Sequence, residues 1–259
     1  MATELVVKPE EKKEPTAVTS PVLSATVDQK SVYTQATNLY QELLQIAGND
    51  IIEIFGESGS GKTSFAHEVI ESAKKMPTPI APTDIIYFDD ERNFKEAPKE
   101  ITYRYKPKWK DMYEEVKKLD AVPSAKLIIL DSLGAPILGE FATMPANERG
   151  QTLLECSAVA YRLKYLSEAK KCLVIILNQP ESEFAKEKGY ELQPFGDKHK
   201  FFVKEIWRSL RMDSSTKDYT YCNIESFRSR QFGRGKLLYS VEVSGAPNAQ
   251  IRKVTRKWQ

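Results

Sequence analysis

The segment that most constrains the fold is the octapeptide Gly56-Glu57-Ser58-Gly59-Ser60-Gly61-Lys62-Thr63. It satisfies the pattern G-x-x-x-x-G-K-[ST], and its glycines let the backbone turn so that successive N–H groups point inward around an anion. An apolar, β-branched run at 51–55 precedes it and predicts a buried strand, while residues 62–75 after it predict a helix. The helix would direct its positive N-terminal end at the same place. The octapeptide is therefore predicted to bind phosphate groups between a strand and a helix.

Each polar side chain at the end of this motif has its own predicted role. The Lys62 ammonium can reach the β- and γ-phosphates of ATP, and the Thr63 hydroxyl can be a ligand of Mg²⁺. Ser64, the next residue of the helix, is included in the predicted ATP site. The alternative is a glycine-rich turn without a ligand, which would not explain why both a strand and a helix flank it. ATP and Mg²⁺ are therefore the predicted cofactors.

Strands and helices alternate along most of the chain. The other predicted strands of the first part are 85–88, 127–130 and 172–177, and the predicted helices include 109–119 and 148–169. Such alternation is typical of an α/β fold, in which helices cover both faces of a mostly parallel sheet. Later apolar segments at 201–210, 219–227 and 237–243 predict successive strands that form an antiparallel C-terminal edge.

Composition divides the chain into three parts. Residues 1–30 mix charged residues with Pro, Ser and Thr and have little apolar periodicity, so they are predicted to be a disordered tail. Residues 31–245 contain the predicted strands and helices and form the folded domain. Residues 246–259 form a basic C-terminal tail, which could contact nucleic acid through its cations and Trp258 or could simply fray.

The bulk composition excludes several classes of protein. No stretch reaches the 18 or more apolar residues of a membrane span, and no apolar run follows the basic residues near the N-terminus. We therefore expect no membrane partner and a cytoplasmic protein. The cysteines Cys156, Cys172 and Cys222 lack metal-ligand spacing and are expected to be buried thiols in a reducing compartment.

Charge is unevenly distributed along the chain. Residues 1–197 carry 24 Lys and Arg against 31 Asp and Glu, whereas residues 198–259 carry 14 against 5. Such asymmetry can mark a surface for nucleic acid or for a protein partner. The alternative is a solvated basic face that meets the acidic part of the same domain.

Acidic and amide side chains follow three of the predicted strands. In a parallel sheet the ligand site lies at the carboxyl ends of the strands, so these side chains should meet near the phosphate loop. Asp131 could complete the Mg²⁺ shell, or it could cap a helix. Glu91, the last residue of the cluster 89–91, could orient a water for hydrolysis, or the cluster could be a solvated turn. Asn178 and Gln179 could sense the γ-phosphate.

Four segments, in order along the chain, resemble the motifs of the RecA superfamily, and the nearest likeness is to the archaeal RadA recombinases and their paralogues. They are EIFGESGSGKT at 53–63, IYFDDE at 86–91, LIILDSL at 127–133 and NQ at 178–179. Further matches are ER at 148–149, PFG at 194–196 and RSLR at 208–211. The likeness covers roughly residues 31–243 and points to an archaeal source.

The resemblance implies a RecA-like ATPase domain over residues 31–245. It assigns Lys62 and Thr63 to phosphate and Mg²⁺, Asp131 to the metal shell, Glu91 to the activation of water and Gln179 to the sensing of nucleotide state. In active relatives the ATP sites lie between neighbouring subunits, which implies a homo-oligomer.

The same arrangement suggests a role for the basic residues Arg228, Arg230, Arg234 and Lys236, which could reach the γ-phosphate bound by a neighbouring subunit. An arginine supplied in this way can raise the rate of phosphoryl transfer by several orders of magnitude. The alternative for each of them is an ordinary surface cation or a contact to DNA.

The chain also departs from the recombinase pattern. We expect no helix-hairpin-helix DNA-binding domain before the core, and the Phe-x-x-Ala segment that joins recombinase subunits has no match. Residues 134–147, which match the first DNA-binding loop, contain no Lys or Arg, and residues 181–193, which match the second, contain four Glu against two Lys. Because non-specific DNA affinity comes mainly from cations at phosphates, these loops weaken the case for a strand-exchange enzyme.

Three functions fit this pattern. The first is a RadA-paralogue ATPase that assists recombinational DNA repair, binding single- or double-stranded DNA weakly or acting on a RadA-type recombinase. The second is a KaiC-like regulatory ATPase whose partner is another protein. The third is a scaffold that binds ATP and barely hydrolyses it.

Overall fold

The computed structural model describes residues 38–94, 98–141, 143–181, 193–196, 198–216, 219–244 and 251–258. They all belong to one compact unit, Gln35–Gln259. The prediction for residues 1–30 lies outside the described residues.

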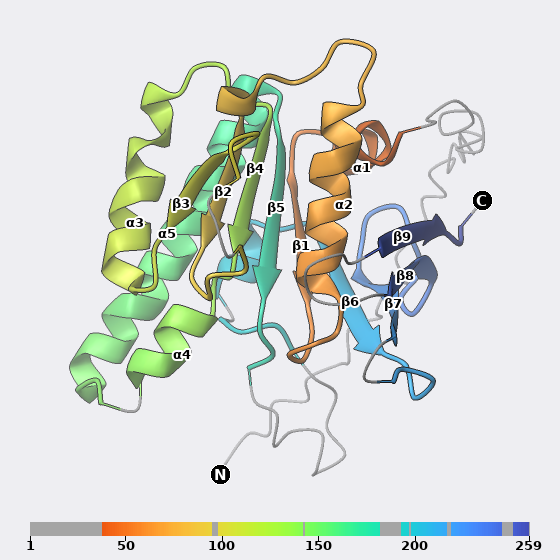
Figure 1. Cartoon of the computed structure of the whole chain (residues 1–259). Coiled ribbons are helices and arrows are strands. Elements are labelled where there is room, and N and C mark those ends of the chain that lie inside the picture. The colour runs from red at the N-terminus through yellow and green to blue at the C-terminus, as the bar shows by residue number, and fades with distance from the viewer. Residues whose placement is uncertain are drawn as a thin grey trace, which may run out of the picture. The chain divides into compact units, whose positions relative to one another are not determined.

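A single nine-stranded sheet organises this unit, with the strand order β3-β2-β4-β5-β1-β6-β7-β8-β9 (Figure 1). The strands are β1 (Ile51–Phe55), β2 (Ile85–Asp89), β3 (Thr102–Tyr105), β4 (Leu127–Asp131), β5 (Leu173–Asn178), β6 (Glu205–Arg211), β7 (Tyr219–Arg228), β8 (Leu237–Ser244) and β9 (Ile251–Arg256). Neighbours from β3 to β6 are parallel, and neighbours from β6 to β9 are antiparallel. The predicted α/β class, with its mostly parallel sheet and antiparallel C-terminal edge, is confirmed.

Helices cover both faces of the sheet. They are α1 (Leu39–Ala47), α2 (Lys62–Lys74), α3 (Trp109–Lys117), α4 (Ala135–Phe141) and α5 (Ala146–Lys170), with short 3₁₀ turns η2 (Pro82–Asp84), η3 (Lys118–Ala121) and η4 (Lys198–Phe201). Figure 1 shows α2 in front of the sheet and α5 behind it. Asn38 caps the start of α1, because its side chain accepts a hydrogen bond from the Gln41 N–H, and Gly48 caps its end in the left-handed conformation.

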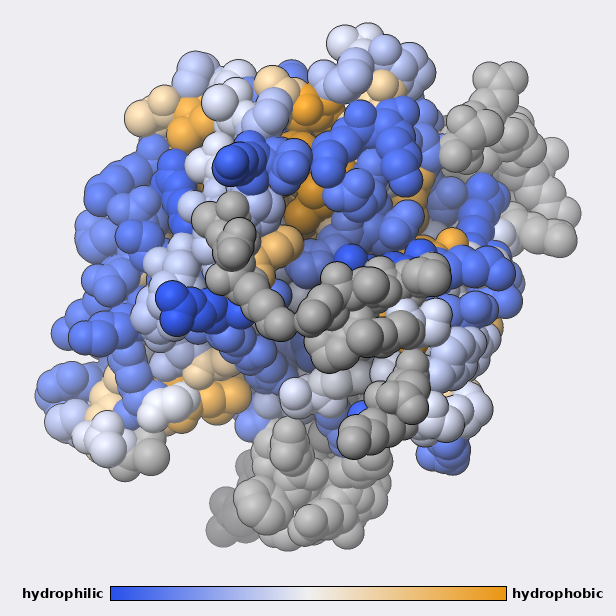
Figure 2. Space-filling model, viewed as in Figure 1, coloured by the Kyte–Doolittle hydropathy of each residue, from blue (hydrophilic) through white to orange (hydrophobic). Residues whose placement is uncertain are grey.

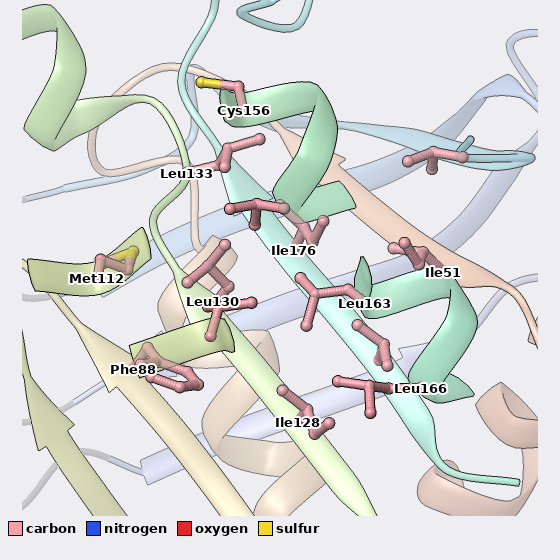
Figure 3. Packing of buried hydrophobic residues seen from close by; sticks show 14 of the residues in the cluster. Ile51, Phe88, Met112, Ile128, Leu130, Leu133, Cys156, Leu163, Leu166 and Ile176 are labelled. Atoms are coloured by element: carbon pink, nitrogen blue, oxygen red, sulfur yellow. The ribbon is translucent and has the colours of Figure 1, made fainter. Parts of the chain in front are cut away.

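The core on the α5 face is built from side chains of two helices and the central strands. Leu163 and Leu166 of α5 and Met112 of α3 pack with Ile128 and Ile176 of the sheet (Figure 3). Every residue of β1, β2, β4 and β5 is buried. Strands covered on both faces are rich in apolar side chains, which is why these four read as nearly continuous apolar runs in the sequence, with Glu53 as the charged residue inside β1.

The strand β3 and the helix α4 were not predicted from the sequence. The edge strand β3 has the sequence Thr-Tyr-Arg-Tyr, and its side chains are only partly buried, so it lacks the apolar run that predicts a covered strand. The α4 helix, seven residues long, contains Pro136 and Gly139, which argue against a helix.

The prediction of a frayed basic terminus was wrong for residues 251–256. They form β9, which pairs with β8 over the whole of its length, and Trp258 beyond it is 4 % exposed. Arg252, Lys253 and Arg256 interrupt the apolar residues of this edge strand, so β9 resembled a solvated tail in the sequence. No helix within the described ranges is long and apolar enough to cross a membrane.

Candidate functional site

The predicted phosphate loop joins β1 to α2 and packs closely against β6 and β7. A Cβ at Gly56 would lie 2.3 Å from the carbonyl oxygen of Ser209 on β6. At Gly61 the backbone is left-handed, with φ of 87°, and a Cβ would lie 3.0 Å from Sγ of Cys222 on β7. Only glycine fits both positions without displacing a neighbouring strand. The spacing of the motif is therefore matched to the sheet on which the loop lies.

Lys62 lies across this loop and closes it. Its ammonium group, in a residue only 6 % exposed, donates hydrogen bonds to the carbonyl oxygens of Gly56, at 2.8 Å, and Glu57, at 2.9 Å. Burial lowers the pKa of Lys62, and the carboxylates of Asp131 and Glu91 act in the opposite direction. A buried cation whose acceptors are loop carbonyls is suited to exchange them for a phosphate, which carries more charge.

Asp131, the last residue of β4, is the acceptor at the centre of the site. Its Oδ2 accepts hydrogen bonds from Thr63 Oγ1 at 2.9 Å, from Tyr87 OH at 2.5 Å and from Asn93 Nδ2 at 3.1 Å. Burial raises the pKa of Asp131 to about 6, against the effect of its hydrogen bonds with Tyr87 and Thr63. Asp131 therefore directs its carboxylate toward the phosphate loop, and it does not serve as a helix cap.

The acidic cluster that ends β2 contains three carboxylates in different surroundings. Asp89 is buried and shapes the turn, since it accepts hydrogen bonds from the Asn93 N–H at 2.7 Å and from Tyr103 OH at 2.7 Å. Asp90 is also buried; burial raises its pKa to about 7, and Ser132 Oγ donates to it at 3.2 Å. The alternative of a solvated acidic turn was therefore wrong for these two residues. Glu91 alone of the three is exposed.

Glu91 faces Gln179, which follows β5. Nε2 of Gln179 lies 3.4 Å from Oε1 of Glu91, a long hydrogen bond between the ends of two strands. Both residues line a pocket of about 290 Å³ together with the phosphate loop. The residues that line it are Ser58, Gly59, Ser60, Gly61, Lys62, Thr63, Ser64, Glu91, Asn93, Asp131, Gln179, Thr220 and Val243. The structure thus brings the predicted catalytic and metal residues and residues 58–64 of the predicted ATP site to one hollow at the carboxyl ends of parallel strands. Gly56 and Glu57, also predicted to bind ATP, do not line it.

Asn178 turns away from this pocket into the protein. Its Nδ2 donates to Glu53 Oε1 at 2.7 Å and to the Phe195 carbonyl oxygen at 3.0 Å. His199 Nε2 lies 2.9 Å from the same oxygen of Glu53, and all three polar side chains are fully buried. Asn178 therefore anchors the chain that follows Gln179 and does not itself sense a ligand.

Four residues of the site were missed in the sequence. Tyr87 reads as a member of an apolar strand, and Asn93 follows the acidic cluster by two residues, a position at which an amide could have been suspected. Thr220 and Val243 come from β7 and β8, far away in the sequence, and carry no local signal. Their place at the pocket depends on the antiparallel edge folding back toward α2.

The side chains at this site fit magnesium and a polyphosphate. A hydroxyl and a carboxylate in contact, from Thr63 and Asp131, are the oxygen ligands that Mg²⁺ prefers. A buried carboxylate with a raised pKa is stabilised in its charged form by a cation beside it. Gly59 and Gly61 have positive φ values, as expected where a loop turns its N–H groups toward an anion.

The four C-terminal cations do not line this pocket within the described part of the chain. Arg230 pairs with Asp50 at 2.5 Å, and Asp50 immediately precedes β1, whereas the phosphate loop follows β1 at its other end, roughly 16 Å away for five strand residues. Arg228 donates to two backbone carbonyls before β6, and Arg234 lies over an aromatic ring. Lys236 is exposed. A contact to a second chain stays a prediction for all four.

The two segments that match recombinase DNA-binding loops differ in what can be described. Most of 134–147 is helical, as α4 and the first residues of α5, and it contains no cation. Within the second segment, 182–192 lie outside the described residues.

Neither a protein-family model nor a curated protein matches the chain. The likeness to the RecA superfamily therefore stays a prediction from motifs, and function is inferred from the site.

Proposed function

We propose that the protein is a magnesium-dependent ATPase built on a RecA-like core. The observation that carries this proposal is one pocket in which Lys62, the Thr63–Asp131 pair and the Glu91–Gln179 pair lie at the ends of adjacent parallel strands. Nucleotides bind at this end of parallel sheets, where helix N-termini and loop N–H groups accumulate. The order of the four sequence motifs supports the RecA-like assignment.

Each side chain then has a chemical task. The loop N–H groups and Lys62 would hold the β- and γ-phosphates. To do so, the Lys62 ammonium would exchange its hydrogen bonds to the carbonyl oxygens of Gly56 and Glu57 for bonds to phosphate oxygens. Thr63 and Asp131 would hold Mg²⁺, which supplies positive charge against the phosphates when bound. The Glu91 carboxylate is exposed and, unlike that of Asp89, does not accept the hydrogen bonds that shape the turn. It can therefore accept a proton from an attacking water or orient that water.

We assign to Gln179 the role of reporting the state of the nucleotide. Its amide shares the pocket with Glu91, while the preceding residue, Asn178, is anchored to Glu53 in the core. A change at the γ-phosphate can therefore move Gln179 without moving the strand behind it. The chain after Gln179 would carry the signal to a partner.

The setting that we propose is accessory work in DNA repair by homologous recombination in an archaeal cytoplasm. The protein would bind single- or double-stranded DNA weakly, act on a RadA-type recombinase and form a homo-oligomer. The order of the motifs and the excess of cations in residues 198–259 support this setting. The cation-free segment 134–147 argues against strand exchange by the protein itself.

One observation favours a second function, that of a KaiC-like regulatory ATPase. The segment 134–147, which would grip DNA in a recombinase, is largely helical and lacks Lys and Arg. A surface of this kind suits a protein partner better than a phosphate backbone. A scaffold that binds ATP with little hydrolysis is disfavoured, because Glu91 lies at the pocket.

Hydrolysis of ATP tests the proposal directly. Turnover should require Mg²⁺, should be lost with a chelator and should be lost in Lys62→Ala. It should also rise when single-stranded DNA is added at low salt and lose that rise at high salt. Turnover without any response to DNA would favour the regulatory ATPase, and no Mg²⁺-dependent turnover at all would refute the ATPase assignment.

A further inference from the structure

The outward face of α5 carries a row of exposed apolar side chains. Leu154 is 49 % exposed, Tyr161 is 59 % exposed and Tyr165 is 54 % exposed, and their spacing places them on one side of the helix. The opposite side of α5 is buried in the core. Exposed apolar side chains that gather on one face of a protein often mark a binding surface. By contrast, the face of the molecule seen in Figure 2 is mainly hydrophilic over α2 and α3.

The short turn η4 extends this row. Phe201 is 75 % exposed, and the ring of its neighbour Phe202 lies 5.4 Å from the ring of Tyr161 in an edge-to-face contact. Tyr161 and Tyr165 are one turn apart on α5, or about 6 Å along its axis. Three exposed aromatic rings, Tyr161, Tyr165 and Phe201, are thus gathered on two adjacent elements. We call these three rings, together with the four cations described next (Lys164, Lys204, Arg228 and Arg230), the α5–η4 face.

Four cations lie on these two elements or bond to residues beside them. Lys164 lies between the two tyrosines in the sequence and is 3.1 Å from the carboxylate of Asp50, which Arg230 also contacts. Asp50 is only 2 % exposed, whereas the Arg230 side chain is 58 % exposed. One buried carboxylate therefore receives two cations. Glu168, an exposed acid on α5, also pairs with Lys164.

The other two cations are tied to η4 itself. The Lys204 ammonium donates to the Phe201 carbonyl at 3.1 Å, and the exposed Arg228 donates to the carbonyl of Val203. These bonds hold both side chains beside η4 while each keeps its positive charge. The local excess of cations agrees with the basic character of residues 198–259.

We propose that the α5–η4 face binds single-stranded nucleic acid. Exposed aromatic rings offer stacking surfaces for unpaired bases, and lysine and arginine side chains around them attract the phosphates. A duplex hides the faces of its bases, so the rings select a single strand. Lysine is depleted in protein interfaces, so an aromatic surface that carries Lys164 and Lys204 fits the phosphates of a nucleic acid better than a protein partner.

The location of the face makes the proposal compatible with nucleotide binding. Asp50 and Arg230 mark the end of the sheet opposite the phosphate loop, so a nucleic-acid strand bound to the α5–η4 face would leave the pocket open. The proposal deepens the proposed function, on which it rests for its setting, because it names the partner and where that partner lies. It also differs from the recombinase pattern, in which the segment 134–147 would contact DNA.

Fluorescence anisotropy with a labelled oligothymidylate of roughly 16 nucleotides tests the face. In Tyr161→Ala/Tyr165→Ala we expect binding at least about tenfold weaker, and in Tyr161→Phe/Tyr165→Phe we expect it retained, because phenyl rings still stack. Lys204→Gln/Arg230→Gln should weaken binding and reduce the slope of log K against log salt by roughly 1.4, for two phosphate contacts. Unfolding temperature and circular dichroism check that the variants fold.

Matched controls and the outcomes decide the proposal. Lys110→Ala/Lys118→Ala removes two exposed cations from the region of α3 and should change binding little. Equal binding by wild type and the Tyr→Ala variant, absence of binding by the wild type, or tighter binding of a duplex would each overturn the proposal. The proposal would also be overturned if the wild type were a dimer and the Tyr161→Ala/Tyr165→Ala variant a monomer that still binds the oligothymidylate. ATP hydrolysis is measured separately. A protein that hydrolyses ATP but does not bind the oligothymidylate refutes only the proposal for the α5–η4 face. A protein that binds the oligothymidylate but does not hydrolyse ATP refutes only the ATPase assignment.

Discussion

The hydroxyl of Thr63 donates a hydrogen bond of 2.9 Å to Oδ2 of Asp131, joining the start of α2 to the end of β4. The same oxygen accepts from Tyr87 and Asn93. Three donors on one oxygen do not offset burial, because the pKa of Asp131 is still raised to about 6. The carboxylate is therefore held ready for a cation at a cost to the stability of the protein without one.

That cost predicts the effect of Asp131→Asn. The pKa of the folded carboxyl lies above its ordinary value of 3.8, so its charge destabilises the fold above about pH 6, and the penalty disappears as the pH falls toward about 4. Without Mg²⁺ at about pH 8, we expect the variant to be more stable than wild type by on the order of 2 kcal/mol, and at about pH 4 to be equal to it. Urea unfolding at both pH values measures this.

Asp213→Asn is the matched control, because Asp213 is exposed and its substitution should change stability by less than about 0.5 kcal/mol. Mg²⁺ with ATP should raise the unfolding temperature of the wild type and much less that of Asp131→Asn, since a ligand stabilises only the state that binds it. A variant less stable than wild type at about pH 8 would show instead that the carboxylate stabilises the fold.

Glu91→Gln should separate binding from hydrolysis. The side chain is exposed and its described contact is the long hydrogen bond with Gln179, so the fold should not change. Loss of a group that accepts a proton typically lowers the rate at least about 100-fold. We expect ATP affinity to stay within about twofold, measured with a fluorescent ATP analogue, and single-turnover hydrolysis to fall.

Glu100→Gln serves as the control for Glu91→Gln, because Glu100 is exposed and does not line the pocket. Unchanged single-turnover hydrolysis in Glu91→Gln would remove Glu91 from its proposed role. A loss of ATP affinity with an unchanged rate constant would instead make Glu91 a binding residue.

The sequence predicts the parts of this fold that depend on local pattern. Four fully covered strands read as apolar runs, and the octapeptide at 56–63 identifies the loop because its glycines are needed for close packing against β6 and β7. Because the carboxyl ends of parallel strands meet at one edge, the sequence alone is enough to place Asp131, Glu91 and Gln179 at one pocket.

The parts that could not be predicted depend on contacts between distant segments. Glu53 looked like an isolated charge in an apolar strand, and only the fold shows that Asn178 and His199 satisfy it. Trp258 and β9 looked like a solvated tail, because Arg252, Lys253 and Arg256 leave no continuous apolar run in this strand. Whether a side chain is exposed also depends on distant segments. The sequence therefore predicted a helix at α5 but did not show that one row of its apolar side chains is exposed.

The buried contact between Glu53 and His199 predicts strong coupling in stability. Both side chains are fully buried, 2.9 Å apart, and Asn178 is the other partner of Glu53. Removing one member leaves a buried polar group without its partner, which typically costs about 1–3 kcal/mol. His199→Ala should therefore destabilise the protein by an amount in that range, measured by urea unfolding.

The double variant Glu53→Gln/His199→Ala tests whether the cost arises from the pair. If the two side chains stabilise each other, the double variant loses less stability than the sum of the single variants. Additive losses would show that each residue acts through other contacts, and a small loss in His199→Ala would show that the pair is not needed for stability.

His67 predicts how stability changes with acidity. It lies on α2 with its ring stacked on Phe94, at 4.5 Å between centroids, and burial, with a smaller effect of Arg252, lowers the pKa of His67 to about 4. The folded pKa is below the ordinary value of 6.5, so the folded protein binds this proton less readily than the unfolded chain. The contribution to stability is complete above about pH 6.5 and is lost as the pH falls toward about 4.

His67→Phe isolates this effect, since a phenyl ring can keep the stacking on Phe94 and does not titrate. The raised pKa values of Asp90 and Asp131 act in the opposite direction over the same range, so the comparison must be between variant and wild type. Between about pH 7 and about pH 4, the stability of the wild type should fall relative to the variant by on the order of 2 kcal/mol, allowing for partial exposure of the ring. Urea unfolding at several pH values gives the difference. A difference that stays constant across this range would mean that His67 keeps its ordinary pKa in the folded protein, and that its ring is hydrated where it packs beside Phe94.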